Sequence, residues 1–321
     1  MALQTIPTVD YHDFVSGDNQ KRQQFIQDLG NAFSQIGFVV VKNHGVTESQ
    51  RQRLFETSEA IFAQPTDIKK KYEDLSNGGQ RGYISKGRET AKGEKVADLK
   101  EFWHIGQEVE DEPALANEYP ANIWLDEVPQ LQKVGWEIYQ TFERTGRNLL
   151  RAIALYLDLD EDYFDGKIKN GNSILRLLHY YPVKSLDEVE EGAVRAAAHG
   201  DINLITLLMG GSAKGLQAMN SDGEWVDVSP NENEIVINIG DMLQRLTNGK
   251  LKSTIHRVIN LDRESMLKPR YSAPFFLHPR SEMDLTCLDS CVDADNPKAY
   301  DDITAGAFLS ERIKELGLLK K

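Results

Sequence analysis

Cysteine is scarce in this chain: Cys287 and Cys291 are the only two among 321 residues. Two thiols cannot build the multiple cross-links that stabilise small secreted proteins, so a disulfide-based fold is excluded. Their spacing, CLDSC, lacks a second pair of ligands and is therefore a weak indication of a zinc site. We predict two reduced thiols without a chemical role, in a cytoplasmic protein.

Positive charge and long apolar segments are lacking as well. The chain has 37 Lys and Arg against 50 Asp and Glu, a formal net charge of −13, whereas binding to a phosphate backbone depends on clustered basic residues. No apolar run approaches the roughly 18 residues of a membrane span. The first residues, MALQTIPTVDYHDF, do not show the basic-then-apolar order of a signal peptide. We expect neither nucleic acid nor a membrane as a partner.

Repeats, low-complexity tracts and long linkers are absent too. Hydrophobic residues make up 40% of the chain and charged residues 27%, a composition that is typical of globular proteins with a sizeable core. The oligomeric state is not determined by these features, and a monomer is compatible with them.

The first half of the chain favours helices. Apolar residues recur at helical spacing in three segments, 19–37, 48–63 and 127–157, of which the last is the longest. The run FVVVKNHGV between the first two predicts a buried strand that ends in a turn. The polar, glycine-containing stretch 76–96 predicts a loop or an irregular hairpin.

From Ser173 onward the pattern changes to short strands separated by turn signals. Many short strands of this kind indicate a sandwich or a barrel. A last helical pattern, AGAFLSERIKELGLL, follows them. We predict an α+β fold with helices first and an all-β body after them. The predicted strands are SILRLLHYY, LITLLM, GLQAM, EWVDV, EIVINI, STIHRVIN and RYSAPFFLH.

Metal-ligand side chains stand at the start of this β body. In AAAHGDINLITLL, residues 196–208, only one glycine separates His199 from Asp201. Successive side chains on a strand alternate between faces, so these two are expected to point the same way. An imidazole and a carboxylate that face one space suggest a metal site, provided that a third ligand exists.

His256, in STIHRVIN, is the candidate third ligand. By itself a histidine within a strand is more often a core residue, but with HGD in the same β body it completes a set. Two histidines and one carboxylate leave three adjacent positions open on a metal, as non-haem Fe(II) oxygenases require. We predict structural or surface roles for the four other histidines without a clear chemical context (His12, His44, His104 and His278), and a turn role for Asp241 in NIGD.

A possible anion clamp follows in KPRYSAPFF. Arg270 and Ser272 are two residues apart on a predicted strand and are expected to face the same side. A guanidinium beside a hydroxyl is well suited to hold a carboxylate. The partner could equally be an internal Asp or Glu, since buried arginines also pair within proteins.

The pattern HGD…H…RYS resembles the isopenicillin-N-synthase-like branch of the iron(II)/2-oxoglutarate-dependent oxygenases. IPTVDY and GFVVVKNHGV are similar to the N-terminal segment of that family, and GGQRGYISKG…DLKEFWHIG to its middle loop and strand. RLLHYYP and NIGDMLQRLTNGKLKSTIHRV are similar to the segments around its iron ligands. The resemblance covers nearly the whole chain, in one order.

The resemblance implies a double-stranded β-helix (jelly-roll) core supported by long helices. Residues 1–120 would form an N-terminal mixed region packed on that core. Residues 121–321 would hold the central helix, the jelly-roll oxygenase domain and a C-terminal helix. The ligands of Fe(II) would be His199, Asp201 and His256.

The resemblance also implies contacts for the bound molecules. Arg270 and Ser272 match the pair that grips the distal carboxylate of 2-oxoglutarate. Tyr181 matches a tyrosine that helps to hold this co-substrate, and Tyr180 would face the substrate. His179 stands where the family often has asparagine among the co-substrate contacts.

A further match concerns the substrate. Arg81, in GGQRGYIS, aligns with a substrate-binding arginine of isopenicillin N synthase, which suggests a carboxylate-bearing substrate. The alternative is a loop arginine in solvent.

The implied reaction uses Fe(II), with 2-oxoglutarate and O₂ as co-substrates, to oxidise a small molecule by hydroxylation, desaturation or ring closure. Isopenicillin N synthase and aminocyclopropane-carboxylate oxidase share these motifs without using 2-oxoglutarate. The former also has a glutamine ligand near its C-terminus, and this chain has no glutamine beyond Gln244. A zinc jelly roll acting as an isomerase, hydrolase or sensor is the alternative of another class. The Arg270 and Ser272 pair disfavours it.

Overall fold

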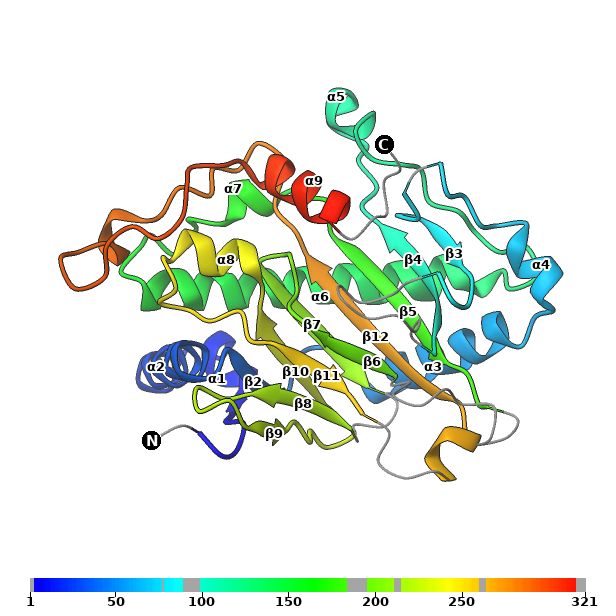
Figure 1. Ribbon diagram of the computed structural model, residues 1–321, viewed down its shortest axis with the longest axis horizontal. Coiled ribbons are helices and arrows are strands. Elements are labelled where there is room, and N and C mark those ends of the chain that lie inside the picture. Colours follow the sequence, from blue (N-terminus) through cyan, green and yellow to red (C-terminus); the bar gives the residue numbers. More distant parts are fainter. Residues whose placement is uncertain are drawn as a thin grey trace.

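Two β-sheets form the centre of the molecule (Figure 1). The computed structural model describes residues 3–76, 78–88, 99–183, 195–210, 215–259 and 264–315. An eight-stranded sheet has the order β1-β2-β10-β7-β12-β5-β4-β3, and a four-stranded sheet has the order β6-β11-β8-β9. The strands are β1 (Thr8–Asp10), β2 (Phe38–Lys42), β3 (Gly82–Ile84), β4 (Glu101–Gly106), β5 (Ile174–Tyr180), β6 (Ala196–His199), β7 (Ile205–Gly210), β8 (Leu216–Met219), β9 (Trp225–Asp227), β10 (Glu234–Ile239), β11 (His256–Val258) and β12 (Arg270–Leu277).

Strands β5 to β12 form the predicted double-stranded β-helix. Along the chain they pass repeatedly between the sheets: β5, β7, β10 and β12 belong to the large sheet, and β6, β8, β9 and β11 to the small one. Antiparallel pairing of β7 with both β10 and β12 forms the middle of the large sheet, and residues of both sheets share an apolar cluster, so the two sheets face each other. The predicted α+β, jelly-roll fold is confirmed.

The two faces of the large sheet differ in what covers them. We call the face toward the small sheet the inner face. Phe38 and Val236 on that face share an apolar cluster with small-sheet residues such as Ala218 and Val258. The outer face carries residues such as Ile237 and Phe275, which pack into the main core with the helices. Because side chains alternate along a strand, its odd-numbered residues lie on one face of the sheet and its even-numbered residues on the other; we call this the parity of a residue.

The helices cover the outer face, and α6 is the longest of them. It lies behind the large sheet in Figure 1, and its buried positions, among them Leu131, Ile138, Phe142 and Leu149, recur at helical spacing. The described helices are α1 (Tyr11–Val15), α2 (Asn19–Gln35), α3 (Glu48–Phe62), α4 (Thr66–Lys70), α5 (Pro113–Ala116), α6 (Gln130–Tyr156), α7 (Asp165–Ile168), α8 (Asp241–Leu246) and α9 (Ala305–Glu315).

The predicted long elements are confirmed with small shifts at their ends. Helices α2, α3 and α6 occupy the three periodic segments, and β2 occupies the apolar run after the first. The stretch 76–96 contains the short strand β3, which pairs with β4; residues 77 and 89–96 of this prediction lie outside the described residues. The same holds for residues 316–319 of the predicted C-terminal helix.

Candidate metal centre

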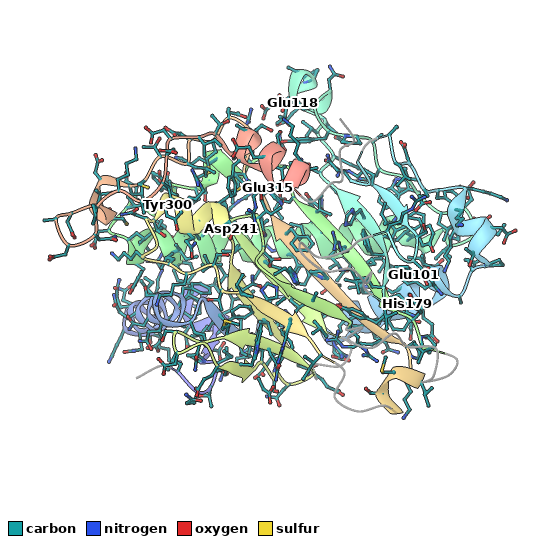
Figure 2. The ribbon with its side chains drawn as sticks, in the orientation of Figure 1. Glu101, Glu118, His179, Asp241, Tyr300 and Glu315 are labelled. Atoms are coloured by element: carbon teal, nitrogen blue, oxygen red, sulfur yellow. The ribbon has the colours of Figure 1, made fainter. Side chains whose placement is uncertain are left out.

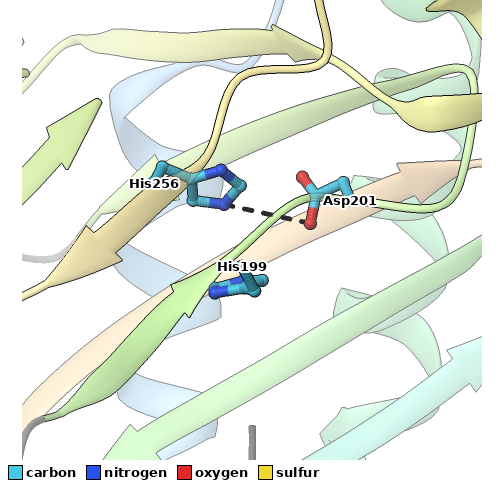
Figure 3. A group of neighbouring side chains, drawn as sticks. All are labelled: His199, Asp201 and His256. Atoms are coloured by element: carbon cyan, nitrogen blue, oxygen red, sulfur yellow. Dashed lines mark ion pairs between the residues drawn. The ribbon is translucent and has the colours of Figure 1, made fainter. Parts of the chain in front are cut away.

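Three predicted ligands lie together between the sheets (Figure 3). One ligand atom from each of His199, Asp201 and His256 lies within 4.8 Å of the other two. Nε2 of His256 is 3.9 Å from Oδ1 of Asp201, and the two imidazole centroids are 4.5 Å apart. Asp201 and His256 are buried, whereas His199 is partly exposed. Within the described ranges this is the only such group of His, Cys, Asp and Glu side chains.

Strand pairing brings the two histidines together. β6 ends at His199 and β11 begins at His256, and these residues face each other in the antiparallel register. Asp201 lies beyond the end of β6. His199 and Asp201 point into the same space, as expected, although only His199 belongs to the strand.

Backbone carbonyls orient both rings. Nδ1 of His199 lies 2.7 Å from the carbonyl oxygen of Ala197, and Nδ1 of His256 lies 3.1 Å from that of Thr254. A carbonyl oxygen can only accept, so in these hydrogen bonds each Nδ1 carries the proton. The lone pair of each ring is then on Nε2, as in the outer-shell arrangement typical of metal-binding histidines.

Asp201 is oriented by two side chains of the large sheet. Its Oδ2 accepts hydrogen bonds from Oγ1 of Thr206 at 2.6 Å and from Nδ2 of Asn238 at 2.7 Å. Both donors lie on the inner face, on β7 and β10. These bonds hold Oδ2 and direct Oδ1 toward His256. Neither donor was predicted from sequence. A polar residue at an inner-face position of each apolar strand was the available signal.

The protonation states suit a cation. Desolvation and the proximity of His256 lower the pKa of His199 to about 4, so the imidazole is neutral at neutral pH. Burial opposes the charge of Asp201, but His256, His199, Asn238 and Thr206 together lower its pKa. Two imidazoles and one carboxylate are the donor set that divalent iron takes in a facial arrangement. The residues present therefore fit Fe(II).

The predicted anion clamp also lies on the inner face. Arg270 and Ser272 are both buried and occupy alternate positions of β12. Arg270 is opposite Tyr180 of β5 in the register, and its guanidinium carbon lies 5.0 Å from the centroid of that ring. Arginine, serine and tyrosine thus meet on the face that carries Thr206.

The two tyrosines differ in their positions relative to Arg270. Tyr180, expected on the substrate side, is the one that lies against Arg270. Tyr181 follows the last residue of β5, and its ring lies 4.1 Å from Nζ of Lys86. The parity of β5 places Tyr180 with Arg270, whereas Tyr181 lies beyond the end of the strand, and its contact with the co-substrate stays a prediction.

His179 requires a second correction. It pairs with Tyr271 in the register, so both side chains lie on the outer face, opposite to Arg270 and Ser272. Its ring stacks on Tyr271 with centroids 4.9 Å apart, and its Nδ1 is 2.9 Å from Oε1 of Glu101. The predicted contact between His179 and the co-substrate is wrong.

The burial of Arg81 decides against one of its two predicted roles. It is fully buried, which contradicts a loop arginine in solvent. Its guanidinium lies so close to Gly106 that a Cβ there would be 1.8 Å from Cζ, so only glycine fits. Burial lowers its pKa, opposed by Tyr139, Tyr119 and Glu108. Gly106 has the same parity on β4 as His104 and Phe102, so its Cβ position, and with it the Arg81 guanidinium, lies toward the inner face. The contact of Arg81 with a substrate stays a prediction.

The remaining predictions concern residues expected to have no catalytic or binding role. Cys287 and Cys291 are free and buried. Asp241 begins α8 and accepts a hydrogen bond from Ser253 at 2.6 Å, in keeping with a structural role. Among the described residues, no helix combines the length and apolar character needed to cross a bilayer.

Comparison with known proteins identifies two matching families along the chain. Residues 6–127 match the N-terminal region described as non-haem dioxygenase in morphine synthesis, and residues 171–279 match the 2OG-Fe(II) oxygenase superfamily. The proline hydroxylase buaE of Petromyces alliaceus is 31% identical over 96% of this chain and 98% of its own length.

Solved structures agree with these matches. A 2OG-Fe(II) oxygenase family protein from Caulobacter crescentus is 39% identical, with a TM-score of 0.87 over 98% of this chain and 100% of its own. A full-length Neurospora crassa protein, solved in complex with alpha-KG and thymine, is 31% identical, with a TM-score of 0.84 over 96% of each chain. The chain therefore belongs to the 2OG-Fe(II) oxygenase superfamily and is an iron- and 2-oxoglutarate-dependent oxidoreductase.

Proposed function

We propose that His199, Asp201 and His256 bind the catalytic Fe(II), and that the chain hydroxylates a small molecule. The convergence of the three ligand atoms, with Oδ2 of Asp201 already held by Thr206 and Asn238, is the observation that carries this proposal. A carboxylate held in this way would bind the metal through its other oxygen, beside the two imidazoles.

We assign the co-substrate clamp to Arg270, Ser272 and Tyr180. A guanidinium and a hydroxyl on one face can donate to both oxygens of the distal carboxylate of 2-oxoglutarate. The ring of Tyr180 supports the guanidinium from the side. The Arg270 and Ser272 pair also supports membership of the isopenicillin-N-synthase-like branch. The free, buried thiols support a cytoplasmic location.

When bound, Fe(II) with 2-oxoglutarate and O₂ supplies the oxidation, in which the co-substrate loses CO₂ and becomes succinate while a substrate C–H bond is oxidised. The residues of the chain position the metal and the co-substrate. Asp201 and the two histidines keep one side of the metal occupied, and Arg270 sets the direction of the co-substrate. The apolar inner-face residues Phe38 and Val236 limit the access of water beside His256.

The two alternatives raised by the sequence disagree with the matches to 2-oxoglutarate-Fe(II) oxidoreductases. An oxidase of the isopenicillin N synthase or aminocyclopropane-carboxylate oxidase type would bind iron but would not need 2-oxoglutarate. A zinc isomerase, hydrolase or sensor would keep the ligands without redox chemistry. The anion clamp on β12 favours the 2-oxoglutarate enzyme over both.

An anaerobic titration of the Fe(II)-loaded protein with 2-oxoglutarate tests the proposal. We expect the weak visible charge-transfer band of the chelate, and we expect Arg270→Leu to require about 100-fold more co-substrate because a charge-assisted pair is lost. Arg245→Leu, in α8, is the matched control and should behave like the wild type. Iron binding without a band would favour the oxidases, and tight zinc binding without O₂-dependent turnover would favour the other class.

A further inference from the structure

Asp241 lies between the two segments of the chain that carry the metal ligands. It is the first residue of α8, which follows β10. One ligand segment holds His199 and Asp201 and comes before it in the sequence, and the other holds His256 and comes after it. A set of ligands drawn from two distant segments binds a metal well only if contacts between those segments fix the separation of the ligands.

Backbone bonds at the start of α8 hold the first ligand segment. The amide of Asp241 donates to the carbonyl oxygen of Asp201 at 2.8 Å, and the amide of Gly240 donates to that of Leu204 at 2.9 Å. The approach is close, because a Cβ at Gly240 would lie 2.1 Å from the carbonyl oxygen of Asn203. The backbone position of Asp201 is therefore tied to α8.

Side chains of α8 hold the second ligand segment. Oδ1 of Asp241 accepts a hydrogen bond from Oγ of Ser253 at 2.6 Å, and Oε1 of Gln244 accepts one from the amide of Ser253 at 2.7 Å. The next residue is Thr254, whose carbonyl oxygen accepts the proton on Nδ1 of His256. Ser253 therefore joins α8 to the stretch of backbone that orients this imidazole.

The hydrogen-bonded pair of Asp241 and Ser253 also packs against Gly200, the residue between the first two ligands. A Cβ at Gly200 would lie 3.4 Å from Oδ1 of Asp241 and 3.5 Å from Oγ of Ser253, and both distances are ordinary van der Waals contacts. The same two atoms thus touch the backbone between His199 and Asp201 and form the bond to the second segment. One hydrogen bond connects both parts of the ligand set.

The second oxygen of Asp241 is directed toward the C-terminal helix. Nη2 of Arg312, in α9, lies 3.5 Å from Oδ2 of Asp241, and Nη1 of Arg312 lies 2.8 Å from Oε2 of Glu315, so these three side chains meet where α9 passes α8 (Figure 2). Both oxygens of Asp241 therefore have partners outside the ligand group. This arrangement fits a residue that supports the metal centre and does not itself bind the metal.

We propose that Asp241, acting through the hydroxyl of Ser253, is a positioning residue that fixes the separation between His256 and the segment of His199 and Asp201. It thereby sets the affinity for Fe(II), because ligands that are already held in place lose less conformational freedom when the metal binds. This inference rests on the proposed function, in which these three residues bind the iron. It extends the role of Asp241 beyond the turn that the sequence predicted.

The test measures iron affinity and stability separately. Anaerobic competition for Fe(II) with a calibrated chelator gives the dissociation constant, and urea denaturation of the metal-free protein gives the unfolding midpoint. Asp241→Ala and Ser253→Ala remove the bond from either side, whereas Asp241→Asn keeps an Oδ1 that can accept from the hydroxyl. Ser58→Ala is the matched control, because the buried hydroxyl of Ser58 donates to the carbonyl oxygen of Leu54 at 2.9 Å within α3.

We expect Asp241→Ala and Ser253→Ala each to raise the dissociation constant for Fe(II) about 10-fold. The double variant should bind iron about as weakly as either single variant, because both substitutions remove the same bond. Asp241→Asn should stay within about threefold of the wild type, since it loses only the partly exposed ion pair with Arg312. Ser58→Ala should lower the urea midpoint and leave the iron affinity unchanged.

Three results would overturn the inference. Iron affinity of the wild-type level in Ser253→Ala, which removes only a hydroxyl and is decisive even if Asp241→Ala does not fold, would leave the bond a structural role alone. Single effects that multiply in the double variant would show that the two side chains act independently. A dissociation constant raised equally by Ser58→Ala would trace the effect to general stability. Failure of the wild type to bind Fe(II) would instead contradict the proposed function.

Discussion

Two buried polar clusters lie on opposite faces of the large sheet and have opposite designs. On the inner face, His199, Asp201 and His256 direct their ligand atoms toward one another. On the outer face, Glu101 accepts from Lys69 at 2.8 Å, from His179 at 2.9 Å and from Tyr83. Figure 2 shows Glu101 and His179 together, at a distance from Asp241, which begins α8.

The difference lies in charge balance. The outer cluster contains an anion and the donors that satisfy it: burial alone would raise the pKa of Glu101, but His179, Lys69 and Tyr83 lower it to about 2. The inner cluster brings two imidazoles and one carboxylate together, with no lysine or arginine among its three members. Burial and titratable side chains are common to both, so neither feature identifies a catalytic site. A metal-binding site is identified instead by acceptor atoms that converge on one point with no donor group between them.

The largest expected effect separates metal binding from stability. His256→Ala should abolish iron binding and reduce 2-oxoglutarate turnover to the level of the metal-free protein, because a facial set of three loses one member. Metal analysis and the chelate band measure this. His179→Ala, on the outer face, is the contrasting variant and should retain iron while losing stability. Retention of stoichiometric iron by His256→Ala would remove it from the ligand set.

The outer cluster should respond most strongly to loss of its cation. Lys69→Met leaves the Glu101 carboxylate buried without its closest positive charge, so we expect the free energy of unfolding to fall by about 3–5 kcal/mol. Urea denaturation of the metal-free protein measures the change. Lys70→Met, an exposed neighbour, should stay within about 0.5 kcal/mol of the wild type.

A double variant sharpens this prediction. Glu101→Gln combined with Lys69→Met removes both charges and should recover part of the loss, since no buried charge then lacks a partner. Equal stability of the single and double variants would show that Glu101 does not stay ionised in the fold.

A smaller effect is expected from the side chains behind the metal centre. Thr206→Val removes the hydrogen bond to Oδ2 of Asp201, so iron affinity should fall about 10-fold. Thr206→Ser keeps the hydroxyl and should bind iron like the wild type. Competition with a calibrated chelator gives both dissociation constants. Unchanged affinity in Thr206→Val would mean that Asn238 alone orients Asp201.

The smallest effect concerns a buried histidine outside both clusters. Burial lowers the pKa of His278 from 6.5 to about 4, although Asp201 acts in the opposite direction. Between these values the unfolded chain binds more protons than the folded one, so stability falls as the pH decreases from 7 toward 4. Between pH 7 and 5.5 this group should account for about 1 kcal/mol.

His278→Phe tests this pH dependence, because it keeps a ring in the same place without a titrating group. Its free energy of unfolding should depend less on pH over this range, by about 1 kcal/mol. If the free energy of unfolding of His278→Phe changes with pH as steeply as that of the wild type, the pH dependence belongs to other histidines. His199 is one of these, because its pKa is also lowered to about 4.

By itself the sequence determined the order and type of the elements and the ligand motif. Apolar periodicity predicted α2, α3 and α6, because a helix that packs on one side must repeat every three to four residues. The alternation within KPRYSAPFF placed Arg270 and Ser272 on one face. These are local properties, and the backbone geometry of a strand or helix is sufficient to produce them.

Only the tertiary structure decided which face of each strand became the interior. Parity groups Tyr180 with Arg176 and separates both from His179 and Tyr181, but it does not state which group meets the small sheet. The pairing of β5 with β12 made that choice and placed Tyr180 beside Arg270. The burial of Arg81 against Gly106 and the pairing of Lys69 with Glu101 were decided in the same way. The partners of a buried charge come from distant parts of the chain, and their positions depend on how the whole sheet packs.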